Sequence, residues 1–138
     1  MAANIIAFIQ FDDNGPVEGQ APFTNEPSLW SLEWDYGLWG CKDYDFIGAI
    51  SGIRNASGKA PLIALRGCPS GNSDVLMKLQ DEPFVGYLSY SEIIRCLEHH
   101  DLSVDRLHRS IQMVLAVLSM LSQKYGDERV RLVFEIQD

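Results

Sequence analysis

The sequence predicts an α/β (α+β) fold: a single domain, residues 1–138, with a small mixed sheet that includes the N- and C-terminal strands. Three observations support this prediction. A β-rich apolar run begins the chain at residues 4–11, an alternating apolar run ends it at residues 130–136, and apolar residues recur at helical spacing over residues 104–125. We therefore expect one long C-terminal helix and several short helices to pack around one core.

Two strands are expected before residue 40. Residues 4–11 are apolar almost throughout, which is typical of an internal strand that is buried on both faces. A turn signal follows at residues 12–16, and the Gly-, Pro- and Asn-rich residues 15–27 are expected to form a long surface loop. Residues 30–34 then alternate between large apolar and polar side chains, which indicates a strand with one exposed face.

The next expected element is a short helix that ends at Arg54 and Asn55. Asp43 or Asp45 can supply its N-cap, because the side-chain oxygens accept hydrogen bonds from free N–H groups of the first turn. The negative charge of either carboxylate also suits the positive end of the helix dipole. The polar loop before this helix and the charged residues after it make the segment a candidate site edge.

Two glycines, Gly48 and Gly52, lie four residues apart in this expected helix, where each costs about 1 kcal/mol relative to alanine. Close approach of another backbone or of a ligand is the usual reason for such a cost. Phe46, Ile50 and Ile53 fall on one face, which we expect to be buried. The segment is therefore either an ordinary buried helix or the edge of a binding site.

Shorter elements are expected between residues 61 and 98. They are a strand at residues 61–65, a helix from Asn72 or Ser73 to Leu79, and an extended segment at residues 84–88. Ser89 and Glu92 then have the spacing of a capping box ahead of apolar residues. A helix is therefore expected near residues 90–98.

The longest helix and the last strand complete the expected fold. Asp101 or Ser103 is expected to begin the helix that covers the sheet, and Gly126 is a candidate for its left-handed C-cap. In the closing strand the apolar residues alternate with Arg131 and Glu135. This alternation predicts a closing strand.

The net charge of −8 is concentrated in the first third of the chain. Residues 1–50 contain eight acidic residues and one basic residue, Lys42, for a net charge of −7. Phosphate repulsion then argues against nucleic acid or anionic lipid along this third. The charge favours a basic partner surface, or serves only solubility.

Cysteine usage and hydropathy indicate a cytoplasmic protein. Cys41, Cys68 and Cys96 fit no zinc or Cys-x-x-Cys spacing and are expected to be free thiols in a reducing compartment. No apolar run reaches the roughly 18 residues of a membrane span. The N-terminus also lacks the basic segment and small-residue cleavage site of a secretory signal. No membrane partner is expected.

No catalytic residue, metal site or cofactor is predicted. His99, His100 and His108 do not have a standard helical metal-ligand spacing. The chain has no Gly-x-Ser-x-Gly elbow for a nucleophilic serine. Residues 67–71 lack the Gly-Lys-Ser/Thr ending of a P-loop.

Two arginines, Arg54 and Arg66, lie beside Gly-bearing turns, where a guanidinium can grip a carboxylate or phosphate bidentately. The alternative is that they pair with Asp43, Asp45 or another acid of the chain. Measuring binding after replacing each by alanine separates these interpretations.

All three tryptophans, Trp30, Trp34 and Trp39, lie close together with Tyr36 among them. Such aromatic density either packs a core or forms a stacking platform for a base or a peptide. The acidic surroundings argue against a nucleic acid on this platform.

Several segments occur in the same order as the motifs of a group of small tailed-phage and prophage proteins. That group carries Arg-Asn-Tyr-Asp-x-Phe followed by Val-Arg-Asn, then Arg-Gly-x-Pro, Ser-Trp-Leu-Thr-x-x-Glu-Leu, and a C-terminal Val-Arg-Leu-Val-Phe. The segments that resemble them are residues 42–47 (KDYDFI) with 53–55 (IRN), 66–69 (RGCP), 87–93 (YLSYSEI) and 130–136 (VRLVFEI). The resemblance implies an α/β fold and a phage-like origin.

This sequence departs from those motifs where the group carries histidines. Residues 4–7 (NIIA) replace a Cys-Asp-Ile-His opening, and residues 84–86 (FVG) replace a His- and Ser-rich segment. No catalytic or metal role is therefore carried over from the resemblance.

These observations favour a non-enzymatic binding protein of phage or mobile-element origin. The leading hypothesis is an anti-CRISPR-like inhibitor of a bacterial defence system, which acts in the host cytoplasm on a host protein with a basic surface. The candidate binding residues of its acidic, aromatic-rich surface are Trp30, Trp34, Trp39, Asp43, Tyr44, Asp45, Arg54, Asn55 and Arg66.

Two alternatives belong to other classes. A protein that binds or sequesters a small nucleotide, or an enzyme acting on one, would use Arg54, Arg66, Tyr44 and Asn55 in a pocket. An immunity protein against a basic nuclease toxin would use the same acidic surface as the inhibitor. A thermal-shift panel of nucleotides and the genomic neighbourhood distinguish these alternatives.

Overall fold

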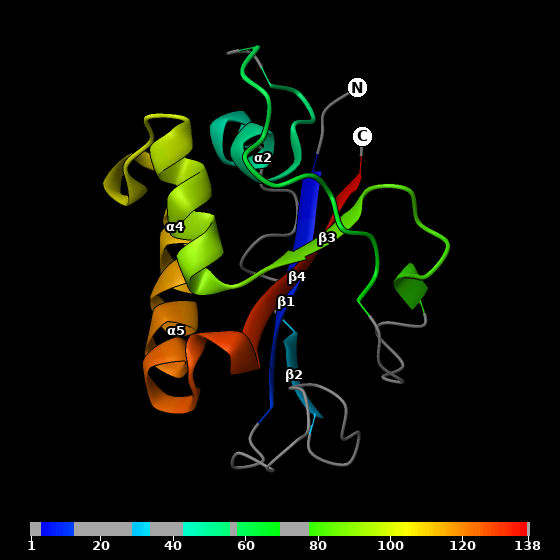
Figure 1. Cartoon of the computed structure of the whole chain (residues 1–138), viewed down its shortest axis with the longest axis vertical. Helices are drawn as coiled ribbons and strands as arrows, with labels where there is room; N and C mark the ends of the chain where they lie inside the picture. Colours follow the sequence, from blue (N-terminus) through cyan, green and yellow to red (C-terminus); the bar gives the residue numbers. More distant parts are fainter. Residues whose placement is uncertain (1–3, 13–28, 34–42, 56–57, 70–77, 138) are drawn as a thin grey trace.

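A computed structural model describes residues 4–12, 29–33, 43–55, 58–69 and 78–137 (Figure 1). The strands and helices in chain order are β1 (Asn4–Asp12), β2 (Leu29–Glu33), α2 (Tyr44–Ser51), β3 (Val85–Leu88), α4 (Tyr90–His99), the 3₁₀ turn η2 (Val104–Arg106), α5 (Arg109–Tyr125), the 3₁₀ turn η3 (Asp127–Arg129) and β4 (Val130–Gln137). This arrangement confirms the expected α+β class. The loop predicted at residues 15–27 lies outside the described residues.

The strands form a sheet of order β2-β1-β4-β3, so that the first and last strands lie side by side at its centre. Their register runs from Asn4 opposite Gln137 to Phe11 opposite Val130. The prediction that the first strand is internal is therefore confirmed. Figure 1 shows the start of β1 and the end of β4 side by side at one end of the sheet.

All the described strand pairs are antiparallel, so the expectation of a mixed sheet is wrong. A parallel neighbour needs a single crossover that returns the chain to the end where the strand began. Here two helices, α4 and α5, run out and back between β3 and β4 (Figure 1). The chain therefore enters β4 from the end at which it left β3.

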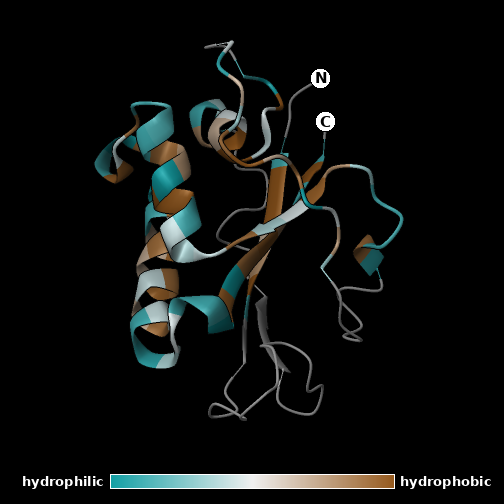
Figure 2. Ribbon diagram, viewed as in Figure 1, coloured by the Kyte–Doolittle hydropathy of each residue, from teal (hydrophilic) through white to brown (hydrophobic). Residues whose placement is uncertain are grey.

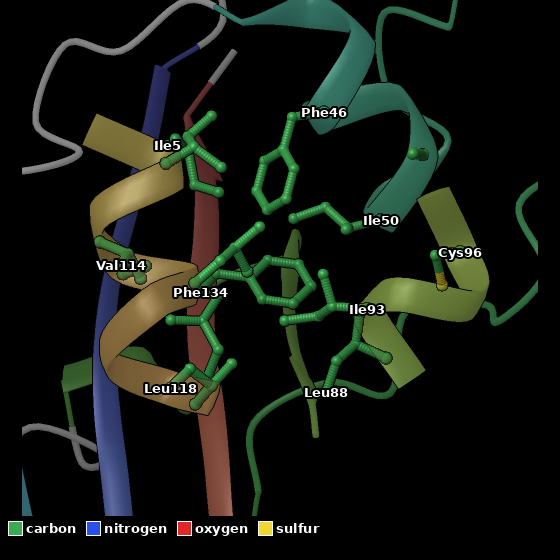
Figure 3. Close-up of a cluster of buried hydrophobic side chains, with 14 of the residues drawn as sticks. Ile5, Phe46, Ile50, Leu88, Ile93, Cys96, Val114, Leu118 and Phe134 are labelled. Carbon is green, nitrogen blue, oxygen red and sulfur yellow. The ribbon is translucent and has the colours of Figure 1, made fainter. Parts of the chain in front are cut away.

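One face of the sheet carries the main core, which α2, α4 and α5 cover (Figure 3). The pleat of each central strand turns alternate residues toward these helices. Phe134 of β4 lies in the middle of this cluster, and its side chain is 1% exposed. Around it lie Phe46 from α2, Ile93 from α4 and Leu118 from α5.

The opposite face of the sheet is also buried along the central strands. Phe8 and Val133 form a second cluster, against which Cys68, Leu79 and Tyr87 pack. Figure 2 shows apolar residues along β1 and β4. The last strand is therefore buried on both of its faces, although its apolar residues alternate with Arg131 and Glu135.

The short helix α2 begins as expected and ends earlier. Asp43 is the N-cap, and its Oδ1 accepts a hydrogen bond from the N–H of Phe46 at 3.2 Å. The helix ends at Ser51 rather than at residues 54–55, because Gly52 adopts a left-handed conformation (φ 77°). The expected close approach is found at Gly48, where an added Cβ would lie 3.2 Å from the Cα of Asn55.

The long helix α5 begins at Arg109, later than expected. Asp101 has a φ of 56°, and Ser103 precedes only the short turn η2. Leu107 then adopts an extended backbone (φ −78°, ψ 164°), which places its side chain in the main core. His108 is the N-cap, and its Nδ1 accepts from the N–H of Ser110 at 3.2 Å.

The shorter predicted elements have mixed outcomes. The capping box at Ser89 and Glu92 is present and begins α4 as expected. Residues 61–65 form no strand; next to them the N–H of Gly67 donates one bond to the carbonyl of Val85. The helix expected from Asn72 or Ser73 to Leu79 falls mostly outside the described residues, of which residues 78 and 79 are helical.

Replacing Gly86 by alanine is expected to destabilise the fold by about 1–3 kcal/mol, because the added methyl overpacks a filled core. Its Cβ would lie 2.8 Å from Cζ of Phe134 and 2.9 Å from Cδ2 of Leu65. Urea denaturation measures the effect. Phe134→Leu is the matched control: the double variant should lose less stability than the sum of the single variants. A neutral Gly86→Ala variant would show that these side chains move aside freely.

Candidate functional site

A small open pocket lies where β3 leads into α4 and η3 leads into β4. Its volume is about 240 Å³. The side chains around it come from the segment before β3, from β3 itself, from the first turn of α4, and from η3 and β4; they are Arg66, Tyr87, Ser89, Glu92, Asp127, Glu128, Val130 and Arg131. We call it the Arg66–Arg131 pocket.

Arg66 is held in this pocket by a bidentate ion pair with Glu92. Its Nη1 donates to Oε1 of Glu92 at 2.9 Å, and its Nη2 contacts Oε2. Nη1 also donates to the carbonyl of Tyr87 at 3.2 Å. The interpretation that this arginine pairs with an acid of the chain is thus confirmed, and the acid is Glu92 rather than Asp43 or Asp45.

Glu92 serves two purposes at once. Its Oε1 accepts from the N–H of Ser89 at 3.0 Å, which closes the capping box of α4, while the same carboxylate holds Arg66. The hydrogen bond from Arg66 lowers the pKa of Glu92 and raises the pKa of the guanidinium. The helix start and the segment before β3 are therefore joined through one side chain.

The ring of Tyr87 lies beside two guanidinium groups. The Cζ atoms of Arg66 and Arg131 are 5.3 Å and 5.4 Å from the centroid of the ring. Both distances are within the range of a cation–π interaction. Tyr87 therefore contacts both the partly exposed Arg66 and the buried Arg131.

Arg131 is the functional candidate that the sequence did not indicate. It is only 8% exposed, and its Nε donates to Oε1 of Gln10 at 2.8 Å. Gln10 is fully buried and lies directly opposite on β1. Burial lowers the pKa of Arg131 to about 10, so the guanidinium remains charged at neutral pH. From the alternating sequence alone, Arg131 is not distinguished from an ordinary polar residue of a strand.

Acidic groups form the rest of the pocket wall. Asp127 accepts from the N–H and the hydroxyl of Ser91 at 3.1 Å and 2.6 Å, which fastens η3 to the first turn of α4. Glu128 is exposed. Pockets for small molecules usually measure about 300–1,000 Å³. A mixed-charge pocket below that range suits one side chain of a partner better than a nucleotide, whose phosphates these acids would repel.

Most of the predicted site residues lie away from this pocket. Tyr44 is 39% exposed and Asp45 is exposed in the first turn of α2. Arg54 is exposed with a φ of 56°, and the side-chain amide of Asn55 donates to the carbonyl of Lys59.

The acidic N-cap of α2 has a structural role that joins two helices. Oδ2 of Asp43 accepts from the N–H of His108, the N-cap of α5, at 2.8 Å, while Oδ1 caps α2.

The backbone of Trp30 lies in β2 opposite Phe11. Trp34 and Trp39 lie outside the described residues. Of the predicted residues whose side chains the structure describes, only Arg66 lines the pocket.

Comparison with models of known protein families, with curated proteins and with solved structures found no match to this chain. Within the described ranges, no cluster of three or more His, Cys, Asp or Glu side chains is arranged to hold a metal ion. The helices described here are also too short or too polar to cross a membrane. Cys96 is a free thiol.

Replacing Glu92 by glutamine is expected to cost about 1 kcal/mol at neutral pH, because the capping box survives while the charge of the ion pair is lost. The pKa of Glu92 is lowered in the folded state. Its ionised form therefore stabilises the fold above about pH 5, and this stabilisation is lost as the pH falls through the lowered pKa. Urea denaturation across this range should show the two proteins converging at low pH. A difference independent of pH would contradict the ion-pair role.

Replacing Gln10 by leucine is expected to destabilise the fold by about 2 kcal/mol or more, because Nε of Arg131 would lose its acceptor inside the protein. Gln10→Glu keeps an acceptor oxygen and adds a negative charge beside the guanidinium. At neutral pH it should lose less stability than the leucine variant in the same denaturation experiment. Equal stability of the leucine variant and the wild type would show that the Gln10 contact contributes nothing.

Proposed function

We propose that the chain is a non-enzymatic binding protein that acts on a protein partner with a basic surface. The observation that carries this proposal is the distribution of charge: residues 1–50 hold −7 of the net charge of −8. Such an acidic segment accelerates encounter with a basic partner and disfavours acidic ones. The finer proposal, inhibition of a bacterial defence system by a phage or mobile-element protein, is supported by the order of the sequence motifs.

The first turn of α2 presents part of this acidic segment to solvent. Tyr44 is 39% exposed and Asp45 is exposed, whereas both carboxylate oxygens of Asp43 accept backbone hydrogen bonds. A tyrosine beside a solvated carboxylate offers apolar area together with charge, and tyrosine is enriched in protein interfaces. Tyr44 and Asp45 are therefore the described residues through which a basic partner would be contacted.

The pocket geometry argues against the nucleotide alternative. Of Arg54, Arg66, Tyr44 and Asn55, only Arg66 lines the Arg66–Arg131 pocket, and its guanidinium is already paired with Glu92. The volume of about 240 Å³ is smaller than a nucleotide site requires. An immunity protein would use the same acidic surface as a defence inhibitor and differs only in its partner.

The double variant Tyr44→Ala, Asp45→Lys is expected to capture at least several-fold less partner than the wild type. The immobilised chain is exposed to host lysate at about 0.05 M and about 0.5 M salt, and the retained proteins are identified and quantified. Capture should also fall at the higher salt, because surface charges are then screened.

Glu98→Lys is the matched control, since it makes the same change of net charge at an exposed position on α4. Equal loss in this control, or capture that is insensitive to salt, would contradict an interface at α2. The finer proposal is tested by counting phage plaques on host strains that produce this chain, with and without the captured defence component. If the chain does not raise the plaque count where the component is present, the finer proposal is contradicted.

A further inference from the structure

The outward face of α5 is apolar in its middle. The exposed residues of this helix all fall on one stripe, at the spacing of a single helix face: Arg109, Met113, Ala116, Met120, Gln123 and Lys124. Met113 and Met120 are 59% and 60% exposed, the highest values among the large apolar side chains described as exposed. We call this surface the α5 stripe.

An exposed face of a helix that packs on a core is normally polar. Isolated apolar residues on a surface need no explanation, but here every exposed position between residues 110 and 122 is methionine or alanine. The helix already buries Ile111, Leu115 and Leu118 on its inner side. The methionines therefore add nothing to the core, and their flexible side chains suit a surface that adapts to a partner.

The charged residues of α5 itself are all basic. Arg109 and Lys124 lie at its two ends, and α5 contains no aspartate or glutamate. The stripe between these cations spans about 22 Å, or four helical turns. We propose that the α5 stripe docks an acidic amphipathic helix of a protein partner, whose apolar side chains pack on Met113 and Met120 and whose carboxylates meet Arg109 and Lys124.

A second copy of this chain fits the stripe poorly. If two stripes met around a two-fold axis, cations would face cations in either direction: Arg109 would oppose Lys124 when antiparallel, and each residue its own copy when parallel. A membrane surface also fits poorly, because Met113 and Met120 are the only large apolar side chains of the stripe and offer little area to insert among lipids. The α5 stripe shares no residue with the acidic surface proposed above. Either proposal can therefore be contradicted while the other stands.

The test uses two synthetic helical peptides of about four turns. Both carry the same leucine stripe; one is flanked by glutamates and the other by glutamines. Fluorescence anisotropy with the full chain should show binding of the glutamate peptide at least tenfold tighter than the glutamine peptide. Met113→Ser with Met120→Ser should raise the Kd of the glutamate peptide at least tenfold, whereas Leu62→Ser, at an exposed position outside the stripe, should not.

Reversing the end charges gives the second arm. Arg109→Glu with Lys124→Glu should abolish the preference for the glutamate peptide while the glutamine peptide still binds, which a loss of folding would not do. Equal affinity for both peptides, no binding of the glutamate peptide, or an unchanged Kd in the methionine variant would overturn the proposal. The proposal would also be overturned by a dimer in solution that the Met113→Ser substitution dissociates, or by tighter binding to phosphatidylserine vesicles than to the glutamate peptide.

Discussion

The pairing of β1 with β4 is the interaction on which the rest of the structure depends. It joins residues at opposite ends of the chain, from Asn4 opposite Gln137 to Phe11 opposite Val130. In the described sheet, β2 attaches to β1 and β3 attaches to β4, so this pairing connects two halves that otherwise share no ladder. Closing so long a loop costs entropy, and burial on both faces of the central strands offsets that cost.

Burial on both faces also explains the chemistry of the small pocket. One face supplies the main core around Phe134, and the other carries the buried contact between Gln10 and Arg131. Tyr87 lies beside that buried arginine and beside Arg66, whose partner Glu92 also closes the capping box of α4. The pocket is thus built from groups that also hold the helices against the sheet.

The two proposed binding surfaces differ in charge and in origin. The acidic one belongs to the first third of the chain, where Tyr44 and Asp45 are exposed at the start of α2. The other lies on the outer side of α5, where Met113 and Met120 have cations at both ends. Opposite charge preferences on separate elements allow one small domain to contact two different protein surfaces.

The sequence by itself determined the features that act within a helical turn or a single strand. They include the α+β class, the internal first strand, the cap at Asp43 and the capping box at Ser89. Tertiary structure decided the features that join distant residues. The direction of β4 follows from a pair of helices, and the late start of α5 follows from burial of Leu107 and the bond between Asp43 and His108. The pocket depends on the contact between Arg131 and Gln10, which are 121 residues apart. No local sequence pattern predicts this contact, because the two residues become neighbours only when the first and last strands pair.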